Sequence, residues 1–297
     1  MNKYEKWIKN NTISLSDKTV LIIGATGTIG KEVLNYLLQL NANVVIGARN
    51  IVKAEHLKID MQKIYPDSQI SIYEVDVSCM LSIDNLYFTL KKDNVMVDIF
   101  INNSGVYHLP QSFSNEGYEI HFATNTLGNY YLATKISDII NEDGKMIFTS
   151  SLSAKYFSVD LFDMQSLKCK NKIKLYARSK RMMTINALGL KNNDVKINLV
   201  HPGVCATELF EKSHSKFFIK VLYPVMKLIF HSPKKAALSI IKGIYINTKV
   251  DEWIAPRGLF EIWGFPKVKK IKKSLFNNEM DTKIIEETNK MVNSKYQ

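Results

Sequence analysis

The sequence has few of the features that mark a secreted, metal-binding or membrane-spanning protein. Only three cysteines, Cys79, Cys169 and Cys205, occur in 297 residues. Their odd number and wide spacing build neither a disulfide framework nor a zinc-binding CxxC pair. The N-terminal segment lacks the apolar core of a secretory signal, and no apolar run reaches the roughly 18 residues that span a bilayer. We therefore expect a protein of a reducing compartment, the cytoplasm, without a metal site.

Acidic residues are also scarce, with 28 against 40 lysines and arginines, which gives a formal charge of +12. The excess is uneven: residues 211–297 hold 17 basic and 8 acidic side chains, whereas the first 210 hold 23 and 20. No nucleic-acid-binding motif accompanies this charge, so we expect no nucleic-acid partner. Two interpretations of the basic end stay open. It forms a solvated surface, or its lysine cluster at 267–273 and the apolar segment 217–230 contact anionic lipid.

Short β-branched runs alternate with longer amphipathic segments along the chain. The runs predict strands at 19–23, 43–47, 70–75, 96–101, 145–150 and 195–200, with helices between them at 29–40, 54–64, 83–91, 118–140 and 176–190. Continuous apolar strands separated by helices indicate βαβ units and a parallel sheet buried on both faces. We predict an α/β fold, a single doubly wound Rossmann-type domain with helices flanking a parallel sheet.

This domain is expected to cover residues 18–265, including a variable substrate lid at about 205–235. Residues 1–17 would form an N-terminal extension, and residues 266–297 a basic C-terminal tail or helix. In such folds ligands bind beyond the carboxyl ends of the strands, so the residues that follow each strand are the ones to inspect.

A glycine-rich turn follows the first predicted strand. Gly24, Gly27 and Gly30 form a GxxGxxG pattern that opens a helix, and such a turn lets a pyrophosphate approach backbone N–H groups. Arg49 follows the second strand, where an arginine suits a 2′-phosphate and an acidic residue would suit a ribose hydroxyl. Asp76 follows the third strand and would accept a bond from an adenine amine or cap the next helix.

Candidate chemical groups follow the later strands. Tyr176 and Lys180 stand four residues apart, so a helix places them on one face. A nearby ammonium would lower the pKa of the phenol from about 10 and suit it to acid–base work. Ser150 and Ser151 end the fifth strand, where a hydroxyl could bind a substrate oxygen, and Asn125 lies within the long helix before it.

Two further loops follow predicted strands and contain candidate cofactor-binding residues. Asn103 and Gly105 belong to an NNSG loop after the fourth strand, which suits a chain passing along a cofactor. After the sixth strand, the sequence HPGVCAT forms a kinked loop with Pro202, Gly203 and Thr207, suited to closing over a nicotinamide.

Together these pieces resemble the short-chain dehydrogenase/reductase family. The motifs GATGTIG, NNSG, TSS, YARSK and HPGVCAT occur in the family's order over residues 18 to 208. The 25-residue interval from Ser151 to Tyr176 is long and typical of the retinol-dehydrogenase-like and SDR-family-member-12-like branch, and it favours Ser151 over Ser150.

The resemblance implies a role for each matching residue. Tyr176 would be the acid–base group, and Lys180 would lower its pKa and hold the ribose. Ser151 would orient the substrate oxygen, and Asn125 would support a proton-relay water. The cofactor would contact Gly24, Thr26, Thr28, Ile29, Gly30, Arg49, Asp76, Asn103, Gly105, Tyr176, Lys180, Pro202, Gly203 and Thr207.

The chain departs from the family pattern at three places. Gly27 stands one position earlier than the usual middle glycine, as in the extended branch of the family. Ile23 replaces the threonine that usually precedes the first glycine, and Ser104 replaces the alanine of NNAG. The three glycines of the turn still permit a phosphate to approach.

We therefore expect an NADP(H)-dependent oxidoreductase that interconverts a carbonyl and an alcohol of a small molecule by hydride transfer. A lipophilic substrate is expected from the apolar residues of the lid, namely Phe217, Phe218, Val221, Leu222 and Met226. Two alternatives stay open: a non-catalytic NADP(H)-sensing protein, and a nucleotide-sugar epimerase of the extended branch. The sequence also leaves open contact with a membrane surface and assembly as a homodimer.

Overall fold

A single twisted sheet organises the molecule. The computed structural model describes residues 1–190, 195–205, 231–271 and 278–294. The strand order is β3-β2-β1-β4-β5-β6-β7-β8. Neighbouring strands run parallel except for β7 and β8, which are antiparallel. The strands are β1 (Thr19–Ile23), β2 (Asn43–Ala48), β3 (Ile70–Glu74), β4 (Val97–Asn102), β5 (Ile140–Thr149), β6 (Lys196–Val200), β7 (Glu252–Pro256) and β8 (Pro266–Lys270).

The predicted α/β fold, a doubly wound Rossmann-type sheet flanked by helices, is confirmed. All six predicted strands are present. The last two strands were not predicted: β7 has a short apolar run, WIAP, that was not recognised, whereas β8 lacks such a run. The β8 segment PKVKK is rich in lysine, as befits a strand at the edge of a sheet, where charge opposes pairing with another chain.

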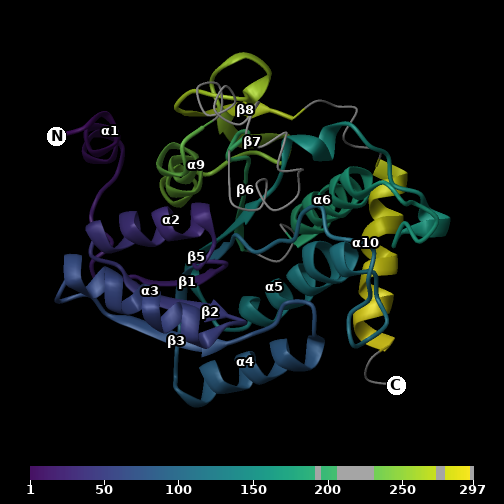
Figure 1. Ribbon diagram of the computed structural model, residues 1–297, viewed down its shortest axis with the longest axis horizontal. Helices are drawn as coiled ribbons and strands as arrows, with labels where there is room; N and C mark the ends of the chain where they lie inside the picture. The colour runs from purple at the N-terminus through teal and green to yellow at the C-terminus, as the bar shows by residue number, and fades with distance from the viewer. Residues whose placement is uncertain (191–194, 206–230, 272–277, 295–297) are drawn as a thin grey trace.

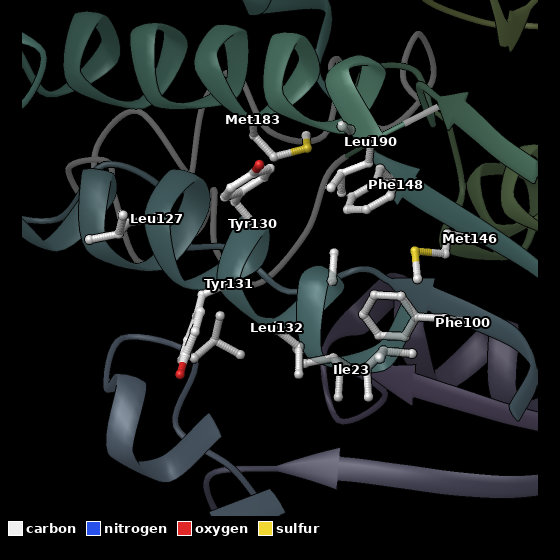
Figure 2. Close-up of a cluster of buried hydrophobic side chains, with 14 of the residues drawn as sticks. Ile23, Phe100, Leu127, Tyr130, Tyr131, Leu132, Met146, Phe148, Met183 and Leu190 are labelled. Carbon is white, nitrogen blue, oxygen red and sulfur yellow. The ribbon is translucent and has the colours of Figure 1, made fainter. Parts of the chain in front are cut away.

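Helices cover both faces of the sheet (Figure 1). One face carries α2 (Thr28–Gln39), α3 (Ile51–Ile64) and α9 (Pro233–Tyr245); the other carries α4 (Met80–Lys92), α5 (Asn129–Ser137) and α6 (Lys172–Gly189). Figure 2 shows the core on the second face, where Phe100 and Phe148 of neighbouring strands meet edge-on with ring centroids 6.3 Å apart. Among the described helices, none combines the length and the apolar composition that crossing a bilayer requires.

Two predicted helices differ most from the structure, since the others begin within three residues of their predicted starts. The segment expected as one helix over 118–140 contains a π-helix, η1 (Phe122–Gly128), followed by α5, and residue 140 already begins β5. The helix expected to open at Tyr176 begins at Lys172 instead, because the Asn171 side chain accepts hydrogen bonds from the first-turn N–H groups of Ile173 and Lys174. Tyr176 therefore lies in the second turn of α6.

Both ends of the chain pack against the body of the protein. In the N-terminal segment, α1 (Lys3–Asn11) buries Ile8 in the core beside α9, and Trp7 stacks on Phe265 with ring centroids 6.5 Å apart. In the C-terminal segment, β8 extends the sheet and α10 (Asn278–Asn293) packs against α6 (Figure 1). Thr288 of α10 is buried and accepts a hydrogen bond from Asn186 at 3.1 Å.

Candidate active site

The turn between β1 and α2 has the shape of an anion-binding turn. Gly24 has a φ of +85°, and a Cβ there would lie 2.8 Å from the carbonyl oxygen of Asn103. A Cβ at Gly30 would clash with the carbonyl oxygen of Gly24. The N-cap residue Gly27 has no side chain to bond the first N–H groups of α2. The turn therefore presents backbone donors and the positive end of the helix dipole, and it fits a pyrophosphate.

The other predicted residues of this turn lie around the same helix start. Thr26, Thr28 and Ile29 are partly exposed. Asn103, at the end of β4, donates from its backbone N–H to Ile23 O at 3.1 Å and from its side chain to Gly24 O at 3.4 Å. The β4 loop is thus fastened to the glycine turn, which is the crevice where a doubly wound sheet binds its ligand.

Arg49 and Asp76 meet beside this turn. The guanidinium Nη1 of Arg49 lies 3.7 Å from Oδ2 of Asp76. The other carboxylate oxygen of Asp76 accepts bonds from the N–H and the hydroxyl of Ser78, at 2.9 and 2.6 Å. Cys79, not Asp76, is the N-cap residue of α4. Helix capping therefore does not account for Asp76, whose side chain instead orients Arg49.

Gly105 and Asn125 lie close together beside Lys180. Asn125 is fully buried in the π-helix, and its amide holds the loop after β4. Its Oδ1 accepts from the N–H of Val106 at 2.8 Å, and its Nδ2 donates to Val106 O and to Ser179 Oγ, both at 2.9 Å. A Cβ at Gly105 would lie 3.1 Å from both Asn125 Oδ1 and Lys180 Nζ. Glycine at position 105 thus lets the loop pass close to both side chains.

The two serines at the end of β5 differ in their surroundings. The Ser150 hydroxyl is buried and bonds Thr184 Oγ1 of α6 at 2.7 Å. Ser151 is partly exposed, contacts the hydroxyl of Ser153 at 2.9 Å and forms a hydrogen bond with the Tyr176 phenol. Of the two hydroxyls, only that of Ser151 adjoins the tyrosine.

Burial dominates the acid–base properties of Tyr176. It raises the pKa of the phenol to about 12, although the hydrogen bond with Ser151 opposes the shift, and the neighbouring Tyr107 adds to it. The Tyr107 ring meets the Tyr176 ring edge-on, with centroids 4.8 Å apart. The expected lowering of this pKa by a lysine is therefore not observed, since the sequence pattern carries no measure of burial.

Lys180 is buried in α6, one helical turn after Tyr176. Its ammonium donates to the carbonyl oxygens of Thr149 at 3.0 Å and Ser104 at 3.5 Å. Burial lowers its pKa to about 8. Lys180 therefore joins the ends of β4 and β5, and it is a cation that gives up its proton more readily than an exposed lysine.

The loop after β6 closes another side of the site. Gly203 has a φ of +86°, and a Cβ there would lie 2.8 Å from Ile262 O. His231 donates its backbone N–H to Val204 O at 2.9 Å, and its ring nitrogen lies 3.1 Å from Pro202 O. The predicted residues Pro202 and Gly203 are thus held between β6 and the β7–β8 hairpin. Thr207 and the predicted lid residues 217–226 lie outside the described residues.

Several residues of the site were not singled out from the sequence. Ser104 Oγ donates to Asn129 Oδ1 at 2.7 Å and lies 3.1 Å from Asn102 Oδ1, and Ser179 accepts the bond from Asn125. The position of Tyr107, two residues after Gly105, was the available signal for its place beside the site. The acceptors of the Lys180 ammonium are the backbone oxygens of Thr149 and Ser104, which no residue type in the sequence indicates.

Comparison with known proteins relates most of the chain to one family. The family model for short chain dehydrogenase matches residues 18–216. Retinol dehydrogenase 14 of Mus musculus is 27% identical over 284 residues, covering 84% of this chain and 85% of the relative. Retinol dehydrogenases 12 and 13 also match.

Solved structures share the fold at lower identity. A putative uncharacterized protein from Mycobacterium paratuberculosis superposes with a TM-score of 0.73 and 18% identity, covering 96% of both chains. The NADPH-dependent 3-quinuclidinone reductase of Rhodotorula rubra superposes with a TM-score of 0.62 and 20% identity, covering 80% of this chain and 89% of its own.

Proposed function

This chain belongs to the short-chain dehydrogenase family, and from that premise we propose that it uses NADP(H) to interconvert a carbonyl and an alcohol on a lipophilic substrate. The proposal is carried by the convergence of three groups at the end of β5. Ser151 bonds Tyr176, and Lys180 is fixed to Thr149 O at 3.0 Å. A hydroxyl, a phenol and an ammonium in one place suit proton transfer at a substrate oxygen.

The chain's own residues fit a nicotinamide dinucleotide. The tight turn that glycine permits at Gly24 and Gly30, and the start of α2 without a side-chain cap, suit a pyrophosphate. Arg49, held by Asp76 at the end of β2, suits a 2′-phosphate and favours NADP(H) over NAD(H). When bound, the nicotinamide supplies or accepts the hydride.

Tyr176 is proposed to move the proton. In the reducing direction, hydride addition at the carbonyl carbon leaves negative charge on oxygen, and the Tyr176 O–H gives its proton to that oxygen. Because burial raises the pKa of this phenol to about 12, Tyr176 is protonated near neutral pH and ready to act as the acid. Lys180 then stabilises the phenolate, and Ser151 donates a hydrogen bond to the substrate oxygen.

A lipophilic substrate is supported by the wall of the site and by the relatives. The half-buried Tyr107 ring stands against Tyr176 and offers an apolar surface to the substrate. Retinol dehydrogenases 12, 13 and 14 are among the matching relatives. Retinal and long-chain aldehydes are therefore the first carbonyl compounds to test.

The test is a panel of carbonyl compounds followed by NADPH absorbance, with Tyr176→Phe beside Tyr107→Phe. Tyr176→Phe should lower kcat by about 10²-fold or more while NADPH binding stays unchanged, since only the proton is lost. Tyr107→Phe removes a hydroxyl from the adjoining ring and should change kcat little. If the wild type binds NADPH but reduces nothing on the panel, an NADP(H)-sensing protein is favoured. Tightly held NAD with sugar epimerisation would favour the extended branch.

A further inference from the structure

The hairpin between β7 and β8, residues 257–265, carries large apolar side chains into solvent. Leu259 is 63% exposed, Phe260 68% and Trp263 40%. They lie within five residues of one another at a single projecting turn, at the end of the molecule that also carries α1 and α9 (Figure 1). A contiguous apolar tip of this kind marks an interaction surface more often than a passive loop.

The hairpin is held in this shape by its own contacts. Phe260 and Glu261 have φ values of 50° and 60°, which non-glycine residues adopt rarely. Glu261 is buried, and its carboxylate accepts a bond from Lys155 Nζ at 2.7 Å. Gly258 N–H bonds Trp263 O at 2.7 Å across the turn. The exposure of the apolar tip is therefore built into the fold, and the uncommon backbone points to a function.

Cations surround this apolar tip. Arg257 and Lys267, which flank the turn where β7 ends and β8 begins, are exposed, and neither forms an ion pair with another described residue. Lys269 reaches back to Gly258 O at 3.3 Å.

Two further cations belong to the same surface. The Lys235 ammonium lies 5.5 Å from the centroid of the Phe265 ring. Burial lowers the pKa of Lys235; Tyr4 opposes this shift, and the positive charges of Lys3 and Arg257 add to it. The one carboxylate of the hairpin, Glu261, is already paired with Lys155. The surface is thus strongly positive around an apolar centre.

We propose that hairpin 257–265 docks on an anionic phospholipid membrane, with its apolar tip in the interface and the surrounding cations on the headgroups. This combination is what an interfacial lipid-binding surface requires. Protection of the β8 edge would explain the lysines of that strand, but not the exposed aromatic residues beside them.

Docking at this surface would bring lipid close to the candidate active site. The Ile262 carbonyl accepts a bond from the N–H of Val204 at 3.4 Å, and Gly203 lies against the same carbonyl. The hairpin therefore contacts the loop that closes the site. Uptake of a lipophilic substrate from the membrane would rest on the proposed function, whereas binding to vesicles does not.

The experiment is co-sedimentation of the full chain with phosphatidylcholine vesicles, with and without phosphatidylserine, at low and high salt. We expect binding that needs phosphatidylserine and is lost at high salt. Arg257→Gln/Lys267→Gln should weaken it about 25-fold, since each cation near the surface contributes about fivefold. Leu259→Ser/Phe260→Asn should weaken it at least about 10-fold. Both positions are exposed and asparagine accepts a positive φ, so this variant keeps the fold.

Matched controls separate this surface from general charge and hydrophobicity. Lys91→Gln/Lys92→Gln removes the same charge from α4, and Phe162→Ser removes a fully exposed phenylalanine elsewhere on the surface. Both should bind vesicles like the wild type. Equal losses in the controls and the hairpin variants, or no binding to phosphatidylserine vesicles at low salt, would overturn the proposal. So would a wild-type dimer that Leu259→Ser/Phe260→Asn converts to a monomer without affecting vesicle binding.

Discussion

The guanidinium of Arg49 lies 3.7 Å from the carboxylate of Asp76, so the segments that follow β2 and β3 are in contact. Both side chains are accessible, with 72% and 34% of their surface exposed. An exposed ion pair of this length contributes little to stability, because water screens it. The pair therefore orients Arg49 without binding it strongly. A phosphate dianion can replace the Asp76 carboxylate as the partner of the guanidinium.

Arg49→Ala should remove most of the preference for NADPH. A charge-assisted hydrogen bond to the 2′-phosphate is lost, so we expect NADPH binding to weaken about 10- to 100-fold. NADH binding should change little, since NADH lacks this phosphate, and it serves as the internal control. Calorimetric titration of both cofactors into both proteins measures the effect. Equal affinities for NADPH and NADH in the wild type would rule out this assignment of Arg49.

The two serines at the end of β5 offer a matched pair of variants. Ser151→Ala should lower kcat on the order of 10²-fold, because the substrate oxygen loses a donor as its charge develops. Ser150→Ala removes a buried bond to Thr184 and should cost about 1 kcal/mol of unfolding free energy while kcat is nearly kept. Steady-state kinetics and urea unfolding of both variants measure the two effects. The reverse pattern would assign the catalytic hydroxyl to Ser150.

The sequence predicted which residues follow the strands, because each buried strand can be recognised from its own apolar run. Continuous apolar runs define the parallel strands, and parallel strands bring their carboxyl ends to one edge. Gly24, Asn103 and Ser151 follow three different strands and all meet at that edge. For these residues, locating the strand was enough to place them at that edge of the sheet.

The remaining features depend on contacts that no sequence pattern encodes. Lys180 is fixed by the main-chain oxygens of Thr149 and Ser104, which any residue would supply. The i,i+4 spacing indicated a cation near Tyr176, but burial, which decides the direction of its pKa shift, depends on the whole fold. The β8 strand was missed because an edge strand does not need an apolar run.

Removing one partner of the buried ion pair Lys155–Glu261 should lower the free energy of unfolding strongly, and removing both charges should restore part of it. Lys155→Met leaves the Glu261 carboxylate buried without its 2.7 Å partner and should cost about 3–5 kcal/mol of unfolding free energy. Lys155→Met/Glu261→Gln removes the second charge and should be more stable than the single variant. Urea unfolding of the three proteins measures this. A double variant less stable than Lys155→Met would show that buried charge is not the cause.

Lys180 should lower stability at neutral pH, and the effect should fade as pH rises. Burial lowers its pKa from 10.5 to about 8. Below pH 8 the ammonium is charged in the folded and unfolded states, and the full cost of burying it applies; above 10.5 it is neutral in both and the cost disappears. Between these values the unfolded state binds more protons, so stability increases with pH.

Lys180→Met isolates this effect, because methionine fills a similar space and does not titrate. The wild type should gain about 2 kcal/mol of unfolding free energy relative to the variant between about pH 7 and pH 9.5. Urea unfolding of both proteins across this range measures the difference, in which the titrations of other groups cancel. Activity should be absent from Lys180→Met at every pH, because the phenolate of Tyr176 loses its cation. A stability difference that stays constant or falls with pH would mean that the ammonium is not buried as the contacts with Thr149 and Ser104 require.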